Sequence, residues 1–105
     1  MKKGELWFVN LNPPMGSEQA GIRPVLIVSG DLLNDYAPVV WICPLTTKLK
    51  NYKGGIILEP NSKNQLSSPS EVLTMHIRSI SKVRLEKKIG EILPSKLSQL
   101  RVGIK

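Results

Sequence analysis

Short apolar runs, separated by polar segments that contain proline and glycine, follow one another along most of the chain. Residues 5–11 alternate apolar and polar side chains and are rich in aromatics, which is typical of a β-strand. Residues 24–29 and 38–45 are apolar on both faces, so we expect buried strands there, the second of them central. Further strands are predicted over residues 56–59, 71–80 and 88–93.

Helical segments are predicted to be few and short. Asp31 can cap one turn over residues 31–35, and residues 81–85 are expected to form another. After Pro94, apolar residues at i, i+3 and i+7 predict an amphipathic helix over residues 94–104. The elements together indicate a mainly β fold with short α segments: a small, strongly bent antiparallel sheet or partly open barrel with a C-terminal helix.

The predicted strand over residues 71–80 has two faces of different character. Leu73, Met75, Ile77 and Ser79 form the more apolar set and are expected to face the core. The other set then points outward, and it includes His76 and Arg78. These two side chains are therefore expected to be accessible to a ligand.

The length and composition indicate a single domain over residues 1–105, with 41% apolar residues and one cysteine. Cys43 lies in an apolar run and is expected to be a small buried side chain, so no disulfide framework is possible within the chain. No apolar run approaches the length of a membrane span, and no secretory signal is recognised. We expect a cytoplasmic protein that does not contact a membrane.

The net charge of +7 is unevenly distributed. Residues 1–47 carry three Lys or Arg against four Asp or Glu, whereas residues 48–105 carry twelve against four. Residues 48–55, called the basic loop below, contribute Lys48, Lys50 and Lys53 together with Tyr52. Such a basic half favours a polyanionic partner, either a nucleic acid or an acidic protein.

A polar segment followed by one arginine stands out early in the chain. Residues 12–23 are long for a hairpin connection in so small a domain, and long loops in compact domains are often functional. Arg23 is predicted to stand at the lip of the strand that Pro24 opens, where a cation is held for a ligand. The alternative is that Arg23 pairs with a surface carboxylate.

Other polar side chains stand at the ends or on the outer faces of predicted strands. Thr46 and Thr47 end the strand over residues 38–45, and the alternative for them is simple β propensity. The carboxylates are scattered and there is one histidine, so no metal-ligand cluster is expected and no cofactor is predicted. Neither a nucleophile–base pair nor a phosphate-binding glycine loop is recognised.

The remaining groups suit cleavage of RNA by its own 2′-hydroxyl without a metal ion. The RNA supplies the nucleophile, so the protein must align it, stabilise charge on the phosphorane and move protons. An arginine fork contacts two phosphate oxygens at once, and a threonine hydroxyl donates to a non-bridging oxygen. Arg23 and Thr46 are the residues that fit these roles.

The sequence contains the block G-S-E-Q-A-G-I-R-P over residues 16–24, with shorter motifs at residues 4–7, 12–13, 44–47 and 77–85. In these motifs, which run in order from residue 4 to about residue 85, the sequence resembles the MazF/PemK toxins of bacterial toxin–antitoxin systems. The block over residues 16–24 is the most specific of them. The resemblance implies the barrel shared with CcdB, a homodimeric sequence-specific endoribonuclease (an mRNA interferase), and an antitoxin partner with an acidic, disordered tail.

The resemblance also implies site residues. Arg23 matches the essential arginine and Thr46 the essential threonine, while Glu18 and Gln19 match the loop that borders the RNA. One branch of the family has histidine where this chain has Ser17 and an aspartate near Met75, so its acid–base assignment does not transfer. Arginine is effectively always protonated, so the general base stays open between Glu18 and His76.

Single-stranded RNA and mRNA are the expected substrates, bound across the dimer. The residues expected to contact RNA are Ser17, Glu18, Gln19, Thr47, Lys48, Lys50, Lys53 and Arg78. The alternative function is a non-catalytic toxin of the same fold that binds a protein such as DNA gyrase, as CcdB does. A plain nucleic-acid-binding barrel is a weaker alternative, because it leaves Thr46 without a role.

Overall fold

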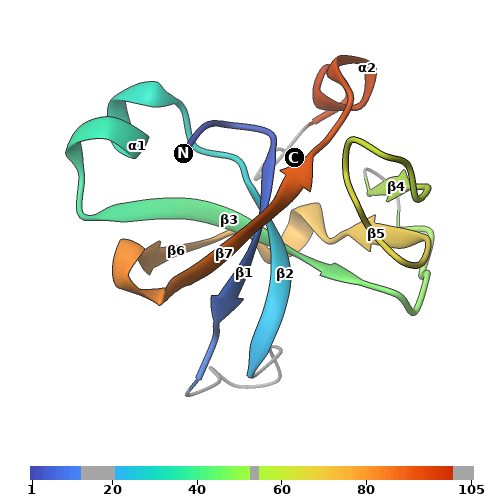
Figure 1. Cartoon of the computed structure of the whole chain (residues 1–105), viewed down its shortest axis with the longest axis horizontal. Coiled ribbons are helices and arrows are strands. Elements are labelled where there is room, and N and C mark those ends of the chain that lie inside the picture. The colour runs from blue at the N-terminus through green and yellow to red at the C-terminus, as the bar shows by residue number, and fades with distance from the viewer. Residues whose placement is uncertain (13–20, 53–54, 101–105) are drawn as a thin grey trace.

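The computed structural model describes residues 1–12, 21–52 and 55–100, which form one strongly curled antiparallel sheet with short helices around it (Figure 1). The strands are β1 Glu5–Asn10, β2 Ile22–Ile27, β3 Val39–Thr46, β4 Ile56–Leu58, β5 Ser70–Val72, β6 Arg78–Ser81 and β7 Leu85–Glu91. The helices are α1 Asp31–Tyr36, α2 Pro94–Leu97 and the 3-10 turns η1 Thr74–His76 and η2 Lys82–Arg84. The predicted mainly β fold is confirmed.

Strand β3 is the centre of the sheet. The strand order is β4-β5-β3-β2-β1-β7, and β6 also pairs with β3, so β3 has three partners. Its apolar character on both faces follows from this place, because each face packs against its own group of buried side chains. The expectation of a central strand over residues 38–45 is therefore confirmed.

Two apolar clusters hold the curled sheet together, one on each face. Leu26, Cys43 and Val72 belong to the first cluster, on which the C-terminal Leu97 and Leu100 pack. Val25 and Ile42 belong to the second cluster, which also takes residues from β1 and β6. Cys43 is fully buried, as predicted, and burial raises the pKa of its thiol to about 12.

The prediction of one continuous strand over residues 71–80 is wrong. Val72 pairs with Leu45 and Arg78 pairs with Ile42, so a separation of six positions in this segment corresponds to three positions in β3. The extra residues leave the sheet as η1. The predicted faces are consequently wrong too: Met75 is 72% exposed, whereas Thr74 and Ile80, from the set expected outside, are buried.

The reason for this break lies in the partner strand. The Leu73 N–H donates to the Pro44 carbonyl, and the N–H and C=O of a residue in a strand point to the same edge. Proline has no N–H, so β3 offers no donor on that edge at Pro44. The segment opposite Pro44 therefore loses few hydrogen bonds to β3 when it leaves the sheet, and η1 forms at this point.

Several element boundaries also differ from expectation. β2 begins at Ile22 rather than at Pro24, because Ile22 and Arg23 pair with β1. β7 covers residues 85–91 instead of 88–93. The terminal helix is short, because α2 ends at Leu97 rather than continuing to residue 104, although Leu97 and Leu100 do pack on the core as their spacing predicted. Residues 101–105 lie outside the described part of the chain.

Gly90 in β7 is expected to be intolerant of a side chain. A Cβ at this position would come within 2.5 Å of the Lys63 carbonyl oxygen and 2.7 Å of the Asn64 carbonyl oxygen, both backbone atoms. We expect Gly90→Ala to lower the free energy of unfolding by roughly 1–3 kcal/mol, as overpacking does. Urea denaturation followed by circular dichroism measures this change.

The matched control is Gly30→Ala. Nothing lies within 4 Å of a Cβ at Gly30, whose φ is −82°. This variant should change the free energy of unfolding by less than about 1 kcal/mol. Equal losses in the two variants would contradict the proposed contact between β7 and the segment around Asn64.

Candidate functional site

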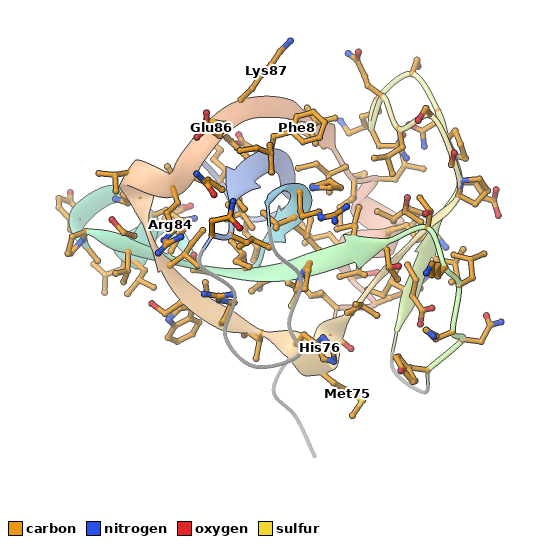
Figure 2. The ribbon with its side chains drawn as sticks, turned by 90° about the horizontal axis from the view of Figure 1, so that it is seen from below. Phe8, Met75, His76, Arg84, Glu86 and Lys87 are labelled. Carbon is orange, nitrogen blue, oxygen red and sulfur yellow. The ribbon has the colours of Figure 1, made fainter. Side chains whose placement is uncertain are left out.

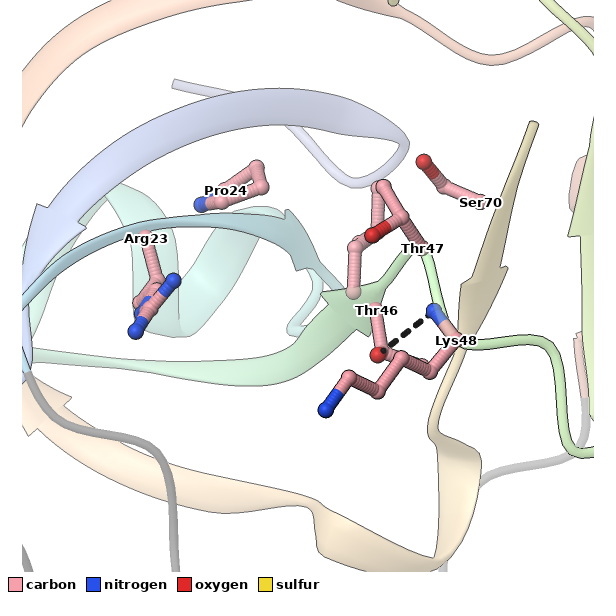
Figure 3. Close-up of a pocket in the computed structure, with 7 residues that line it drawn as sticks. Arg23, Pro24, Thr46, Thr47, Lys48 and Ser70 are labelled. Atoms are coloured by element: carbon pink, nitrogen blue, oxygen red, sulfur yellow. Dashed lines mark hydrogen bonds between the residues drawn. The ribbon is translucent and has the colours of Figure 1, made fainter. Parts of the chain in front are cut away.

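The candidate site lies where β2 and β3 part (Figure 3). The two strands pair with Val25 opposite Pro44, Leu26 opposite Cys43 and Ile27 opposite Ile42. Continuing this register by two residues puts Arg23 opposite Thr46. Figure 3 shows both side chains on the same side of the ribbon, so the two residues singled out in the sequence belong to one site.

Pro24 explains why pairing stops at this point. The Val28 N–H donates to the Trp41 carbonyl, so these two residues form a hydrogen-bonded pair. Every second pair of an antiparallel ladder is of this kind, and in this register Pro24 and Leu45 stand at such a position. Pro24 has no N–H to donate to Leu45. β2 nevertheless continues on its other edge, where Arg23 pairs with Val9. Pro24 is thus inside β2 and does not open it.

A pocket of about 300 Å³ opens between the parted strands. The ladder between β2 and β3 covers Val25–Ile27 and Ile42–Pro44, while Leu45 and Thr46 pair with β5 on the other edge of β3. The residues that line the pocket are Arg23, Pro24, Leu45, Thr46, Thr47, Lys48 and Ser70. The pocket therefore combines two cations with three hydroxyl groups, a set that suits a phosphate group.

The Thr46 hydroxyl is oriented by the backbone that follows it. Its oxygen accepts a hydrogen bond from the Lys48 N–H at 3.1 Å. Because this bond uses a lone pair and not the hydroxyl hydrogen, the O–H can donate to a bound ligand. Thr46 is half-buried, whereas Arg23 and Lys48 are exposed, so their charges reach the pocket from the solvent side.

The basic loop begins at the pocket and is held by a buried carboxylate. Glu71 accepts hydrogen bonds from the N–H groups of Lys50, Asn51 and Tyr52 at 2.6, 2.9 and 2.9 Å. Burial alone would raise the pKa of this carboxyl group, but the three N–H donors and the nearby Lys50 ammonium outweigh burial and hold the pKa below its usual value. Glu71 is therefore ionised at neutral pH although its side chain is 1% exposed.

The segment between β1 and β2 is closed at its base. Gly21, at a φ of +81° that favours glycine, donates its N–H to the Asn12 side chain at 2.9 Å, and its carbonyl accepts from Leu11. Arg84 donates to the carbonyls of Asn10 and Asn12. Ser17, Glu18 and Gln19 lie outside the described residues, and their roles stay predictions.

Some predicted site residues lie away from the pocket. His76 is exposed on η1, where it projects from the ribbon beside Met75 (Figure 2), and it does not line the pocket. Arg78 is half-buried and lines a separate shallow depression with Trp41, Ile77 and Ser79. Lys50 belongs to the described part of the basic loop, whereas Lys53 lies outside the described residues.

Sequence reasoning missed two residues of this region. Ser70 lines the pocket and is buried, but it follows an aperiodic polar segment that gives no signal. Glu71 was expected only as the first residue of a strand, and its partners are 19 to 21 residues away in the sequence. The only signal in the sequence was that Glu71, a charged residue, directly precedes apolar residues of a strand. This signal does not indicate which backbone groups the carboxylate contacts.

The described residues contain neither a metal-ligand cluster nor a membrane-spanning helix. No three His, Cys, Asp or Glu side chains gather there as they would around a metal ion. In the same part of the chain, no helix has the length and apolar character that a membrane span requires.

Comparison with known proteins shows extensive similarity. The chain is 33% identical over 105 residues to the endoribonuclease MazF of Staphylococcus saprophyticus, covering 99% of this chain and 88% of that protein. Its fold matches a MazF structure from Deinococcus radiodurans with a TM-score of 0.78 and 27% identity, over 94% of this chain and 87% of the other. A MazE–MazF structure from the same organism matches with a TM-score of 0.71 and 28% identity, over 94% and 86%.

A family model agrees with these matches over almost the whole chain. The model describes PemK-like, MazF-like toxins of type II toxin–antitoxin systems and matches residues 2–105. The resemblance first seen in the G-S-E-Q-A-G-I-R-P block is thereby confirmed. The chain belongs to the PemK-like, MazF-like toxin family of type II toxin–antitoxin systems.

Proposed function

We propose that this toxin is an endoribonuclease that cleaves single-stranded mRNA at specific sequences without a metal ion, and so inhibits translation and growth. The observation that carries the proposal is that Arg23 and Thr46 line one basic pocket. The full-length relative from Staphylococcus saprophyticus is named an endoribonuclease, which supports the same class of activity. We expect the reaction in the cytoplasm, where mRNA is translated.

The proposed reaction starts from the 2′-hydroxyl of the RNA. Its oxygen forms a bond to the adjacent phosphorus, the bond from phosphorus to the 5′-oxygen breaks, and the products carry a 2′,3′-cyclic phosphate and a 5′-hydroxyl. The Arg23 guanidinium contacts two non-bridging oxygens and stabilises the phosphorane, while the Thr46 O–H donates to a non-bridging oxygen. Lys48, in the same pocket, adds positive charge.

Two protons must move in this reaction. A general base takes the proton of the 2′-hydroxyl, and an acid gives one to the leaving 5′-oxygen. Glu18 and His76 are the candidates for the base, and Arg23 can serve as the acid. The exposed position of His76 on η1 is accessible to a bound strand, although His76 is not part of the pocket lining.

The basic loop and the pocket together define a path for the RNA backbone. Lys48 and Lys50, with the predicted Lys53, contact phosphates, and Ser17, Gln19, Thr47 and Arg78 are the further residues proposed to contact RNA. We propose that the protein acts as a homodimer. We also propose a cognate antitoxin whose acidic tail occupies the same basic surface and so inhibits the enzyme.

Substitutions of Arg23 and Thr46 are expected to lower RNA cleavage by different amounts. Arg23→Ala should abolish cleavage, whereas Thr46→Val should lower kcat by roughly 10–1000-fold, the range for one lost transition-state hydrogen bond. Thr46→Ser keeps the hydroxyl and serves as the control with near-normal activity. The measurement is cleavage of a long single-stranded RNA in excess EDTA, with chemical analysis of the cut ends.

Cleavage by Arg23→Ala at the normal rate would show that the site is wrongly assigned. Ends carrying a 3′-hydroxyl and 5′-phosphate would rule out attack by the 2′-hydroxyl. If the folded, antitoxin-free protein cuts none of several RNAs, the non-catalytic toxin that binds a protein such as gyrase becomes the better assignment.

The general base can be identified from the pH dependence of kcat/KM. A base must lose its proton before it can act, so the rate falls on the acidic side of its pKa. We expect this acidic limb to disappear in either Glu18→Gln or His76→Gln, but not in both, and to persist in Thr46→Ser. An unchanged limb in both variants would exclude the two candidates.

A further inference from the structure

We propose that Glu71 is a positioning residue, whose buried carboxylate holds the basic loop so that Lys48 and Lys50 face the RNA at the Arg23–Thr46 pocket. The inference rests on the proposed function, because it concerns the same pocket and substrate. Glu71 itself is not expected to touch RNA, since its side chain is 1% exposed. Its effect is transmitted through the backbone of the loop.

Three consecutive N–H groups converge on this one carboxylate. Lys50 and Asn51 donate to Oε1, and Tyr52 donates to Oε2. Asn51 has a φ of +55°, a left-handed conformation that turns successive N–H groups toward one side. Such a concave arrangement of N–H groups binds anions, and in this protein the anion is a side chain of the chain itself.

The strand register ties this anchor to the pocket. Glu71 of β5 pairs directly with Thr46 of β3, so the residue that holds the loop lies next to the residue proposed to donate to the phosphate. The Lys48 N–H bonds to the Thr46 hydroxyl oxygen at 3.1 Å. The loop is thereby fixed at Lys48 by one contact and at residues 50–52 by three more, with Lys48 lining the pocket.

The same geometry argues against Glu71 as the general base. Both carboxylate oxygens are occupied by backbone donors, and the low pKa keeps the carboxylate a weak proton acceptor. A base must also reach the 2′-hydroxyl, and Glu71 is buried and does not line the pocket. Its loss should therefore affect binding of RNA more than the chemical step.

The test is Glu71→Gln, which keeps the size of the side chain. One carboxylate oxygen becomes an amide NH₂, which cannot accept a hydrogen bond from the backbone N–H that faces it. We expect KM to rise roughly tenfold with kcat within about threefold of wild type, because phosphate contacts are lost and the catalytic groups stay. The salt dependence of binding should also flatten, by about 0.7 in the slope of log K against log salt per lost phosphate contact. Binding is measured on the RNA that wild type cuts, made with a 2′-deoxy nucleotide at the cleaved position.

Asn64→Asp is the matched control for lost stability. Asn64 is also buried and holds its own loop, accepting from the Leu66 N–H and donating to the Glu59 carbonyl. An aspartate at position 64 keeps the oxygen acceptor and loses the N–H donor. The substitution therefore disturbs a loop that lies outside the pocket. This variant should keep the wild-type KM and salt slope at a comparable loss of stability.

A double-mutant cycle separates positioning from a general structural effect. In a Lys48→Ala/Lys50→Ala background, Glu71→Gln should weaken RNA binding no further, because the charges that Glu71 positions are already gone. Full additivity of the two changes would overturn the proposal. Tighter binding by Glu71→Gln, as expected if the emptied N–H groups took up a phosphate, would overturn it as well.

Gly55→Ala provides a second route if Glu71→Gln does not fold. A Cβ on Gly55 would lie 2.5 Å from the Glu71 Oε2, so the methyl group must displace the carboxylate from its donors. The same rise in KM and flatter salt dependence are expected. Wild-type cleavage with unchanged KM in Gly55→Ala would refute the positioning role alone, whereas no cleavage by wild type would refute the proposed function.

Discussion

The arrangement of partners around β3 is the constraint on which the site depends. On one edge this strand pairs with β2 over Ile42–Pro44, and on its other edge it pairs with β5 at Leu45 and Thr46. Pro24 ends the first ladder because it offers Leu45 no N–H. The two strands can then part while the end of β3 stays paired with β5 on its other edge, and the pocket forms between Arg23 and Thr46.

A basic protein that binds a polyanion needs several cations on one surface. These cations repel one another, so the backbone that carries them must be held in place by other contacts. In this chain, an internal carboxylate helps to meet that requirement, because Glu71 organises the backbone of Lys50, Asn51 and Tyr52 from below. Its charge is compensated by N–H dipoles rather than by the lysine side chains alone. Lys48 and Lys50 are exposed, so their ammonium groups lie on the solvent side, where a phosphate can reach them.

The sequence predicted those features that depend on local pattern. The strands, the central place of β3 and the choice of Arg23 and Thr46, which line one pocket, followed from alternation, apolar runs and a specific motif. Interruption of the strand over residues 71–80 was not predictable from that segment, because its cause is Pro44, on another strand. The role of Glu71 was likewise hidden, since hydrogen bonds across 19 to 21 residues leave no mark on local composition.

Apolar packing remote from the chemistry sets the geometry of the pocket. Ile56, Leu58 and Val72, from the β4–β5 hairpin, are buried in the same cluster as Cys43 and Leu45 of β3. This packing fixes which residue of β5 lies opposite Thr46, because a slip of one residue would turn Val72 out of the core. The register then brings Glu71 beside Thr46, and with it the loop that carries Lys48 and Lys50. The alignment of hydroxyl, guanidinium and ammonium groups thus follows from burial of aliphatic side chains rather than from attraction among the charged groups themselves.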